Sequence, residues 1–243
     1  MTALAERLRQ RYFGGEPHPY RFLDDEVARL LPPGGALLDA GCGRGAPMLR
    51  QYIGRASVLV GVDLVDFRGE AEGMRLIQSD LAHIDVPSGS IDVVMSRSVM
   101  EHVADPRAVY TEMHRVLKPG GHFVFLTPNL WDYASLIARC VPNRLHPWIV
   151  ARTEGRAEED VFPVEYRTNT RRAVHRWADA TGFDIVSFRY LGQYPNYFLF
   201  NGALFLMATA YEKTLARFES LAFLRGWILT ALRKRDDAPR SGS

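Results

Sequence analysis

The stretch "LLDAGCGRGA", residues 37–46, sets an apolar, strand-like run directly before an aspartate and three glycines. Glycines allow a tight turn after a strand and a close approach of the backbone to a ligand. The loop reads as G-x-G-x-G, and through Gly41, Gly43 and Ala46 also as G-x-G-x-x-A, a permitted dinucleotide fingerprint. By itself it therefore indicates a nucleoside-containing cofactor and leaves its kind open.

Composition limits the classes of function. The 243 residues are 47% hydrophobic, enough for one elaborated domain, and the formal net charge of +2 provides no argument for nucleic-acid binding. The two cysteines, Cys42 and Cys140, form neither a disulfide framework nor a metal-ligand spacing, so we expect no metal and a reduced, cytoplasmic setting. We see no signal peptide and no apolar run of the roughly 18 to 20 residues that a membrane span needs.

Short apolar runs alternate with helical patterns from residue 36 to 128. This alternation predicts an α/β fold with a doubly wound, Rossmann-like, mostly parallel sheet and helices on both faces. The predicted strands are 36–39, 58–63, 75–79, 91–96 and 122–127, with helices at 46–53 and 106–117. A helix at 170–181 and a strand at 183–190 follow later. The remainder, 196–234, predicts one or two apolar helices and thus a helical C-terminus.

We expect a single domain with five parts. Residues 1–35 form N-terminal helices, 36–128 a cofactor-binding core, and 129–168 an insertion. The insertion lacks a clean period, and long irregular segments after a strand often act as lids or substrate-binding segments. Residues 169–235 hold the C-terminal strand and apolar helices, and 236–243 form a disordered tail.

Carboxylates recur where three of the predicted strands end: Asp39, Asp63 and Asp80. A carboxylate at Asp39 would repel a pyrophosphate but suits a cofactor that carries an ammonium group. Carboxylate oxygens also accept hydrogen bonds from ribose hydroxyls and from an adenine amino group. The three aspartates therefore favour an amino-acid nucleoside, although the spacing of Asp63 also fits the ribose-binding acid of a nicotinamide enzyme.

Two further motifs follow in order, "SIDVVMSRSVMEHVADP" at 90–106 and "EMHRVLKPGGHFVFLTPN" at 112–129. With them, residues 20–128 resemble the class I S-adenosylmethionine-dependent methyltransferases, in particular the type 11 small-molecule group. The resemblance implies S-adenosylmethionine as cofactor. It implies cofactor contacts at Asp39, Gly41, Cys42, Gly43, Asp63, Leu64, Asp80, Leu81, Ser96 and Arg97. The family's usual antiparallel last strand has no clear counterpart after residues 183–190.

Candidates for other parts of the site come from single residues. Arg21, which precedes the core, is placed to fold over a cofactor carboxylate. Methyl transfer to an alcohol or amine needs a base, and His102 follows the fourth strand at the edge where the methyl group should point. A structural hydrogen bond to nearby backbone is the alternative role for His102. In the insertion, the predicted substrate-binding residues are Tyr133, His146, Trp148 and Tyr166.

The leading hypothesis is a methyltransferase that acts on a small molecule at oxygen, with a natural product, sugar or lipid-like acceptor. One alternative is an NAD(P)-dependent oxidoreductase, and another is a catalytically inactive, methyltransferase-like binding module. The apolar C-terminal helices, which end in basic residues, predict either a peripheral membrane contact or a homodimer contact.

Overall fold

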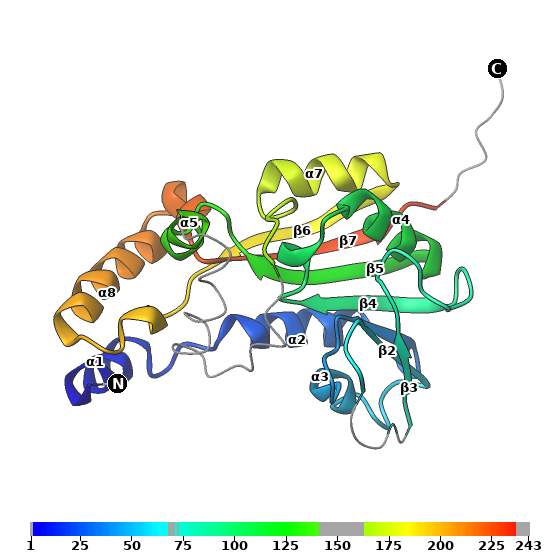
Figure 1. The fold of residues 1–243 in the computed structure, drawn as a ribbon, viewed down its shortest axis with the longest axis horizontal. Coiled ribbons are helices and arrows are strands. Elements are labelled where there is room, and N and C mark those ends of the chain that lie inside the picture. Colours follow the sequence, from blue (N-terminus) through cyan, green and yellow to red (C-terminus); the bar gives the residue numbers. More distant parts are fainter. Residues whose placement is uncertain (1, 68–70, 72, 141–162, 237–243) are drawn as a thin grey trace.

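The computed structural model describes residues 2–67, 71, 73–140 and 163–236, and places seven strands in one sheet (Figure 1). The strands are β1 (Ala36–Ala40), β2 (Val58–Asp63), β3 (Arg75–Gln78), β4 (Ile91–Arg97), β5 (Leu117–Pro128), β6 (Phe183–Leu191) and β7 (Trp227–Lys234). Their order is β3-β2-β1-β4-β5-β7-β6, and β7 runs antiparallel to both of its neighbours. The predicted mostly parallel, doubly wound fold is confirmed.

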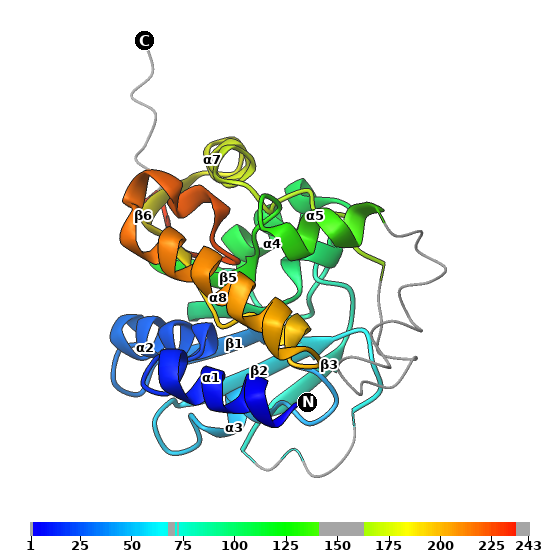
Figure 2. The ribbon, with the colours of Figure 1, turned by 90° about the vertical axis from the view of Figure 1, so that its left-hand side faces the viewer.

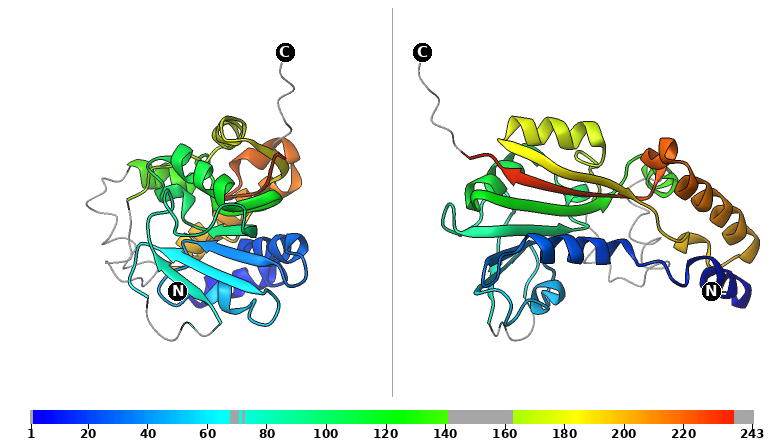
Figure 3. Two further views of the ribbon diagram at one scale, coloured as in Figure 1. Left: turned by 90° about the vertical axis from the view of Figure 1, so that its right-hand side faces the viewer. Right: turned by 180° about the vertical axis from the view of Figure 1, so that it is seen from behind.

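Helices cover both faces of the sheet (Figure 3). On one face, α2 (Pro19–Leu30) and α3 (Pro47–Arg50) pack against β1 and its neighbours through residues such as Leu23 and Leu49. On the other, α4 (Pro106–Val116) and α7 (Arg171–Ala180) pack around Tyr110 and Phe183. Side chains alternate along a strand, so Asp39 shares with Leu37 the face that α2 covers.

Local capping explains where the helices begin. The Asp105 side chain accepts a hydrogen bond from Ala108 N at 3.2 Å, and Pro106 is the first residue of α4. Thr170 caps α7 in the same way, accepting from Ala173 N at 3.1 Å. Predicted helix boundaries therefore agree here to within a residue or two. The helix predicted at 46–53 is shorter, because only Pro47–Arg50 is α-helical.

An arm extends past the carboxyl ends of the parallel strands (Figures 1 and 2). It consists of α1 (Ala3–Phe13), the short helix η4 (Asn196–Phe198), α8 (Gly202–Arg217) and η5 (Glu219–Leu224). Thr2 N donates to Leu199 O at 2.9 Å, and Ala5, Phe13 and Phe205 form a small buried core between α1 and α8. α5 (Tyr133–Cys140) begins the insertion and lies beside this arm in Figure 2.

The prediction of a helical C-terminus is wrong for its last part. Residues 227–234 form β7, which pairs Thr230 with Phe125 of β5 and with Phe188 of β6. Five consecutive residues, Ile228 to Leu232, are buried because both faces of this strand are covered. Such a strand loses the alternation of polar and apolar residues and resembles a buried helix. The antiparallel last strand that the resemblance implies is thus present, but it comes later in the sequence because α8 and η5 lie between β6 and β7.

The position of β7 reduces the number of residues that are available for the predicted contact with a membrane or a second copy of the chain. The apolar side chains of β7 are core residues, and the exposed ones lie in the arm, where Phe200 is 64% and Met207 68% exposed. A contact with a membrane or a second copy stays a prediction, confined to the arm. Within the parts of the chain that the structure describes, every helix is too short or too polar to cross a bilayer.

A truncation tests the position of β7. A chain that ends at Arg225 loses Ile228, Leu229 and Leu232, each buried, at about 1.5–3 kcal/mol per side chain. That loss matches the roughly 5–15 kcal/mol by which a whole domain is stable. We expect the truncated chain to show no cooperative thermal transition by circular dichroism. A control chain that ends at Asp236 should melt like the full chain, and equal melting of both truncations would contradict this account.

Candidate active site

The glycine loop follows β1 in a conformation that requires glycine. Gly41 has φ +88°, and a Cβ added there would lie 2.1 Å from Cγ2 of Val99. Gly43 also lies in the left-handed region, at φ +69°. The N–H groups of Gly41 and Cys42 both donate to the Val62 carbonyl, at 2.8 and 3.2 Å. The loop is therefore held against the end of β2 on one side and against the segment after β4 on the other.

This loop lines a cavity of about 380 Å³ at the carboxyl ends of β1 and β4. The lining residues are Asp39, Gly41, Cys42, Gly43, Arg44, Gly45, Pro47, Met48 and Arg97. A doubly wound sheet binds its ligands where the chain reverses direction across the sheet, and here that point lies between β1 and β4. The cavity thus occupies the expected place for a nucleoside cofactor.

Asp39 is the buried charge of this cavity. Its side chain is only 2% exposed, and burial raises its pKa to about 7, with Arg97 opposing the shift and Asp63 and Asp24 adding to it. A carboxyl group in this setting ionises readily only when a cation approaches it. Asp39 therefore favours a ligand with an ammonium group, whereas Arg44 and Arg97 in the same lining suit a carboxylate.

Arg97 lies beside α2. Its guanidinium lies over the Tyr20 ring, 4.5 Å from the centroid. Burial raises the pKa of Asp24, and the charge of Arg97 opposes that shift. Asp24 Oδ1 is buried and has no hydrogen-bond partner among the residues that the structure describes. The predicted Arg21 is exposed on α2. Sequence reasoning missed Tyr20 and Asp24, which, like Arg21, lie outside the lining of the cavity but interact with Arg97. The spacing of Tyr20 and Asp24, one helical turn apart beside Leu23 and Val27, was the available signal.

Asp63 ends β2 and joins it to the loop. Its Oδ2 accepts from Gly43 N at 2.7 Å and its Oδ1 from Val65 N at 3.2 Å. Leu64, the next residue, is 54% exposed although it is apolar. Each carboxylate oxygen keeps further lone pairs, so Asp63 can still accept from ligand hydroxyl groups.

Asp80 and Leu81 follow β3, farther along the same edge. Asp80 is exposed and its Oδ1 accepts from Ala82 N at 2.7 Å, whereas Leu81 is 8% exposed. Because the strand order is β3-β2-β1-β4, the carboxyl ends bring Asp80, Asp63, Asp39 and Arg97 into one row. Such a row fits an elongated ligand, although Leu64, Asp80 and Leu81 lie beyond the cavity that the loop lines.

Two other predicted cofactor residues are buried. Ser96 is fully buried and its Oγ donates to the Ala40 carbonyl at 2.8 Å, which links the end of β4 to that of β1. Cys42 is 5% exposed, and burial raises the pKa of its thiol well above the usual range. A thiol in that state stays protonated, so Cys42 contributes a backbone and a small side chain to the loop and no nucleophile.

His102 ends η1 (Met100–His102) and has a defined tautomer. Its Nδ1 lies 2.9 Å from the Pro163 carbonyl oxygen, which can only accept, so in the neutral ring Nδ1 carries the proton and Nε2 the lone pair. Nε2 lies 3.9 Å from Oε1 of Glu101. Glu101 is 5% exposed and its Oε2 accepts from Thr127 Oγ1 at 2.9 Å. The ring is thus oriented by backbone, with its basic nitrogen on the side of a buried acid.

The described parts of the insertion hold two of the four predicted substrate-binding residues. Tyr133 stacks on Phe198 of the arm, 5.9 Å between ring centroids, and burial raises its pKa. Tyr166 has φ +52°, and its N–H donates to the Glu101 carbonyl at 3.0 Å. His146 and Trp148 lie outside the described residues.

Asp132 is a buried acid at the start of the insertion that sequence reasoning missed. It is 6% exposed, and burial raises its pKa to about 6 against the hydrogen bonds of nearby backbone N–H groups. Its Oδ2 accepts from Ala134 N at 3.1 Å. Its sequence context, after Trp131, predicts an ordinary turn, and only the packing of the arm shows that it is buried.

Comparison with known proteins decides the family. The profile of the family described as "Methyltransferase domain" matches residues 15–188. The chain belongs to the class I S-adenosylmethionine-dependent methyltransferases. Its cofactor is S-adenosylmethionine. This result removes the nicotinamide alternative, in agreement with the buried Asp39 at the glycine loop.

Curated proteins are similar in sequence to part of this methyltransferase. It is 31% identical to the ubiquinone biosynthesis O-methyltransferase of Cereibacter sphaeroides over 142 residues, 51% of this chain and 58% of that protein. It is 31% identical to the arsenite methyltransferase of Aquipseudomonas alcaligenes, over 41% of this chain and 34% of that protein. The chain spans between 33% and 58% of the length of the first curated relatives that it matches. A crystal structure of an S-adenosylmethionine-dependent methyltransferase from Mesorhizobium loti has the same fold, with a TM-score of 0.55, 20% identity and coverage of 87% of this chain and 100% of that one.

A pair of glycine variants tests the loop. Gly41→Ala drives a Cβ into Val99 at a strained backbone angle and should weaken S-adenosylhomocysteine binding about tenfold or more, roughly 1.4 kcal/mol. Gly15→Ala is the control, because a Cβ there meets no atom within 4 Å and Gly15 lies outside the lining of the cavity. Isothermal titration calorimetry gives both affinities. If both variants bind like the unmodified protein, the close approach of Gly41 to Val99 does not shape the cavity.

Proposed function

We propose that this protein transfers the methyl group of S-adenosylmethionine to an oxygen atom of a small molecule. The observation that carries the proposal is the buried Asp39, which together with Arg97 lines a glycine-lined cavity at the reversal point of the sheet. His102, which follows the same strand as Arg97, adds a basic nitrogen near that edge. An oriented base favours an acceptor that must lose a proton, such as an alcohol or a phenol.

In this proposal each charged residue at the ends of the strands binds one part of the cofactor. In this proposal the Asp39 carboxylate holds the ammonium group and the Arg97 guanidinium the carboxylate, while the backbone of Gly41, Cys42 and Gly43 lies against the methionine part. Asp63 accepts from the ribose hydroxyls. Leu64, Asp80 and Leu81 surround the adenine, where the exposed apolar side chain of Leu64 would be covered.

The bound cofactor supplies an electrophilic methyl group on a sulfonium, so the protein's main task is to position the acceptor in line with it. Transfer of that methyl group to the acceptor oxygen would leave S-adenosylhomocysteine and one proton to be removed from the acceptor. His102 Nε2 takes the hydroxyl proton, and the Pro163 carbonyl holds the ring in the tautomer that this step requires. Glu101 then stabilises the imidazolium that forms.

The acceptor lies in this proposal under the arm, against Tyr133 and Tyr166, with His146 and Trp148 as further binding residues. Aromatic rings suit the apolar faces of a natural product, a sugar or a lipid-like compound. Relatives carry names that refer to ubiquinone biosynthesis, arsenite and a sterol, so they support a small acceptor without choosing among these classes. The exposed Phe200 and Met207 of the arm add a peripheral membrane or homodimer contact to the proposal.

A histidine variant tests the base. His102→Ala should lower kcat by a factor of about 10² to 10⁴ while S-adenosylhomocysteine affinity stays within twofold, because the ring does not line the cofactor cavity. His175→Ala, at an exposed position of α7, is the control. The assay follows S-adenosylhomocysteine release with a panel of phenols, sugars and prenylated quinols.

Two outcomes would contradict this proposal. Equal losses of turnover and of cofactor affinity in His102→Ala would assign the residue a structural role. A protein that binds S-adenosylmethionine tightly but releases no S-adenosylhomocysteine with any acceptor of the panel would instead fit the inactive binding module.

A further inference from the structure

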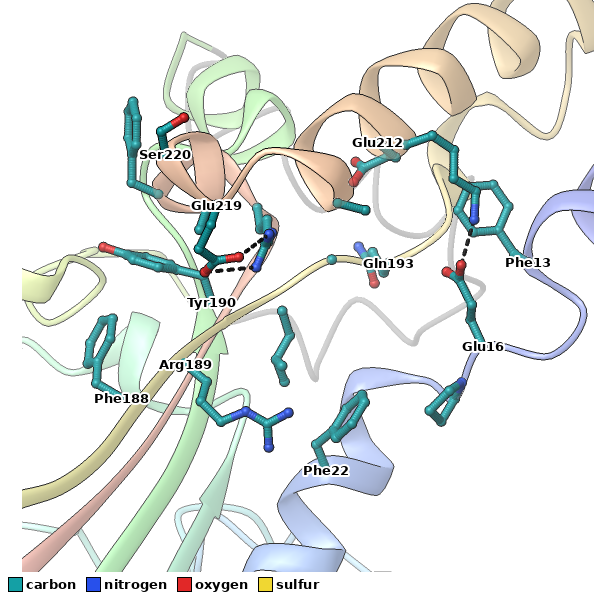
Figure 4. A pocket seen from close by; sticks show the side chains of 18 of the residues that line it. Phe13, Glu16, Phe22, Phe188, Arg189, Tyr190, Gln193, Glu212, Glu219 and Ser220 are labelled. Atoms are coloured by element: carbon teal, nitrogen blue, oxygen red, sulfur yellow. Dashed lines mark hydrogen bonds and ion pairs between the residues drawn. The ribbon is translucent and has the colours of Figure 1, made fainter.

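A second cavity, of about 930 Å³, lies between the arm and the outer edge of the sheet (Figure 4). Its walls come from the α1–α2 segment, the end of β6, the C-terminal half of α8 and η5. Its lining shares no residue with the lining of the cofactor cavity. It is therefore a separate site, and the proposed cofactor and acceptor contacts do not use its residues.

Aromatic rings form much of the wall: Phe13, Phe22, Phe188, Tyr190 and Phe223. Cationic side chains lie on three of these rings. Lys213 Nζ is 4.2 Å from the centroid of Phe13, Arg189 lies 5.0 Å from that of Phe22, and Arg171 lies 5.6 Å from that of Phe188. The wall thus combines a large apolar area with three rings that already hold cations of the protein itself.

Four of the seven charged side chains in the wall form two ion pairs, which leaves Arg171, Arg189 and Glu212. Lys213 Nζ lies 2.5 Å from Glu16 Oε1, and Arg225 Nη2 lies 2.8 Å from Glu219 Oε2 (Figure 4). Arg225 also donates to the Leu215 carbonyl at 3.0 Å. These two ion pairs account for two of the three acids that line the cavity.

Glu212 is the third acid and has no such partner. It is 6% exposed, and its carboxyl takes part in none of the hydrogen bonds or ion pairs among the described residues. Its Oε2 lies 3.7 Å from where a Cβ would stand on Gly192, and Figure 4 shows the carboxyl near Gln193, across the opening from Arg189. Burial, with the charges of Asp132 and Glu16, raises its pKa to about 8. A buried acid in this state lacks a cation.

We propose that this cavity binds a small organic cation, an amine with an apolar or aromatic body, whose ammonium group is held by Glu212. The ammonium supplies the charge that Glu212 lacks, and the body lies against the rings of Phe22 and Phe223. Arg189, on the far side of the opening, repels the cation toward the Glu212 end. This site goes beyond the proposed methyl transfer and does not depend on it.

The test uses the full chain saturated with S-adenosylhomocysteine and three probes of similar shape: 4-phenylbutylamine, 4-phenylbutan-1-ol and 4-phenylbutyrate. We expect the amine to bind at least tenfold more tightly than the alcohol, measured by NMR titration. Glu212→Gln should remove this preference, whereas Glu219→Gln, which removes an acid already paired with Arg225, should keep it. Affinity for S-adenosylhomocysteine should be unchanged in both variants.

Proton release in the unmodified protein is an independent measurement. Glu212 is largely protonated at pH 7, so binding an ammonium group there must displace its proton, and amine affinity should rise between pH 6 and pH 8. Calorimetry in two buffers of different ionisation enthalpy counts the protons released. The proposal is overturned by equal binding of alcohol and amine, by preferred binding of the carboxylate, by binding of none of the probes, or by an amine affinity that does not change with pH.

Discussion

The contact of Gly41 with Val99 is the constraint on which the cofactor site depends. β1 and β4 are neighbours in the sheet, and the segments that leave them must separate to open a cavity. Gly41 lets the loop turn away at φ +88° while it passes Val99 more closely than any side chain would allow. The Val62 carbonyl then fixes the loop through two N–H groups. Backbone geometry thus forms the cavity, and the side chains of Asp39 and Arg97 give it polarity.

Buried acids near the carboxyl edge give the protein a common electrostatic character. The pKa values of Asp39, Asp132 and Glu212 are raised to about 7, 6 and 8, in each case chiefly by burial. A raised pKa means that the folded state binds protons that the unfolded state has lost, so folding stability falls as pH rises from about 4 toward 8. A ligand ammonium beside one of these acids reverses the effect at that site. Ligand binding and folding are therefore coupled through the same carboxyl groups.

The sequence was most informative where local rules determine the structure. β2 occupies the predicted residues 58–63, and α4 begins at Pro106 because Asp105 and Pro106 specify a helix start. β7 was missed because its five buried residues, 228–232, show no strand period and follow an inserted helix. Tyr20 was missed for a different reason, since only the tertiary contact of its ring with Arg97 gives it a place in the site. Burial of Asp132 and Glu212 likewise arises from the arm, which no local pattern specifies.

The family profile matches the core of the sheet but none of the helices that form the arm. The family profile ends at residue 188, so it includes the glycine loop, Asp63 and Arg97 but excludes α8, η5 and β7. Most of the wall of the second cavity, from Arg189 to Arg225, lies in that unmatched part. Because β7 inserts between β5 and β6, the arm is connected covalently to the second strand from the β6 edge of the sheet. The glycine-loop cavity therefore lies within the part of the chain that the family profile matches, whereas most of the second cavity lies outside it.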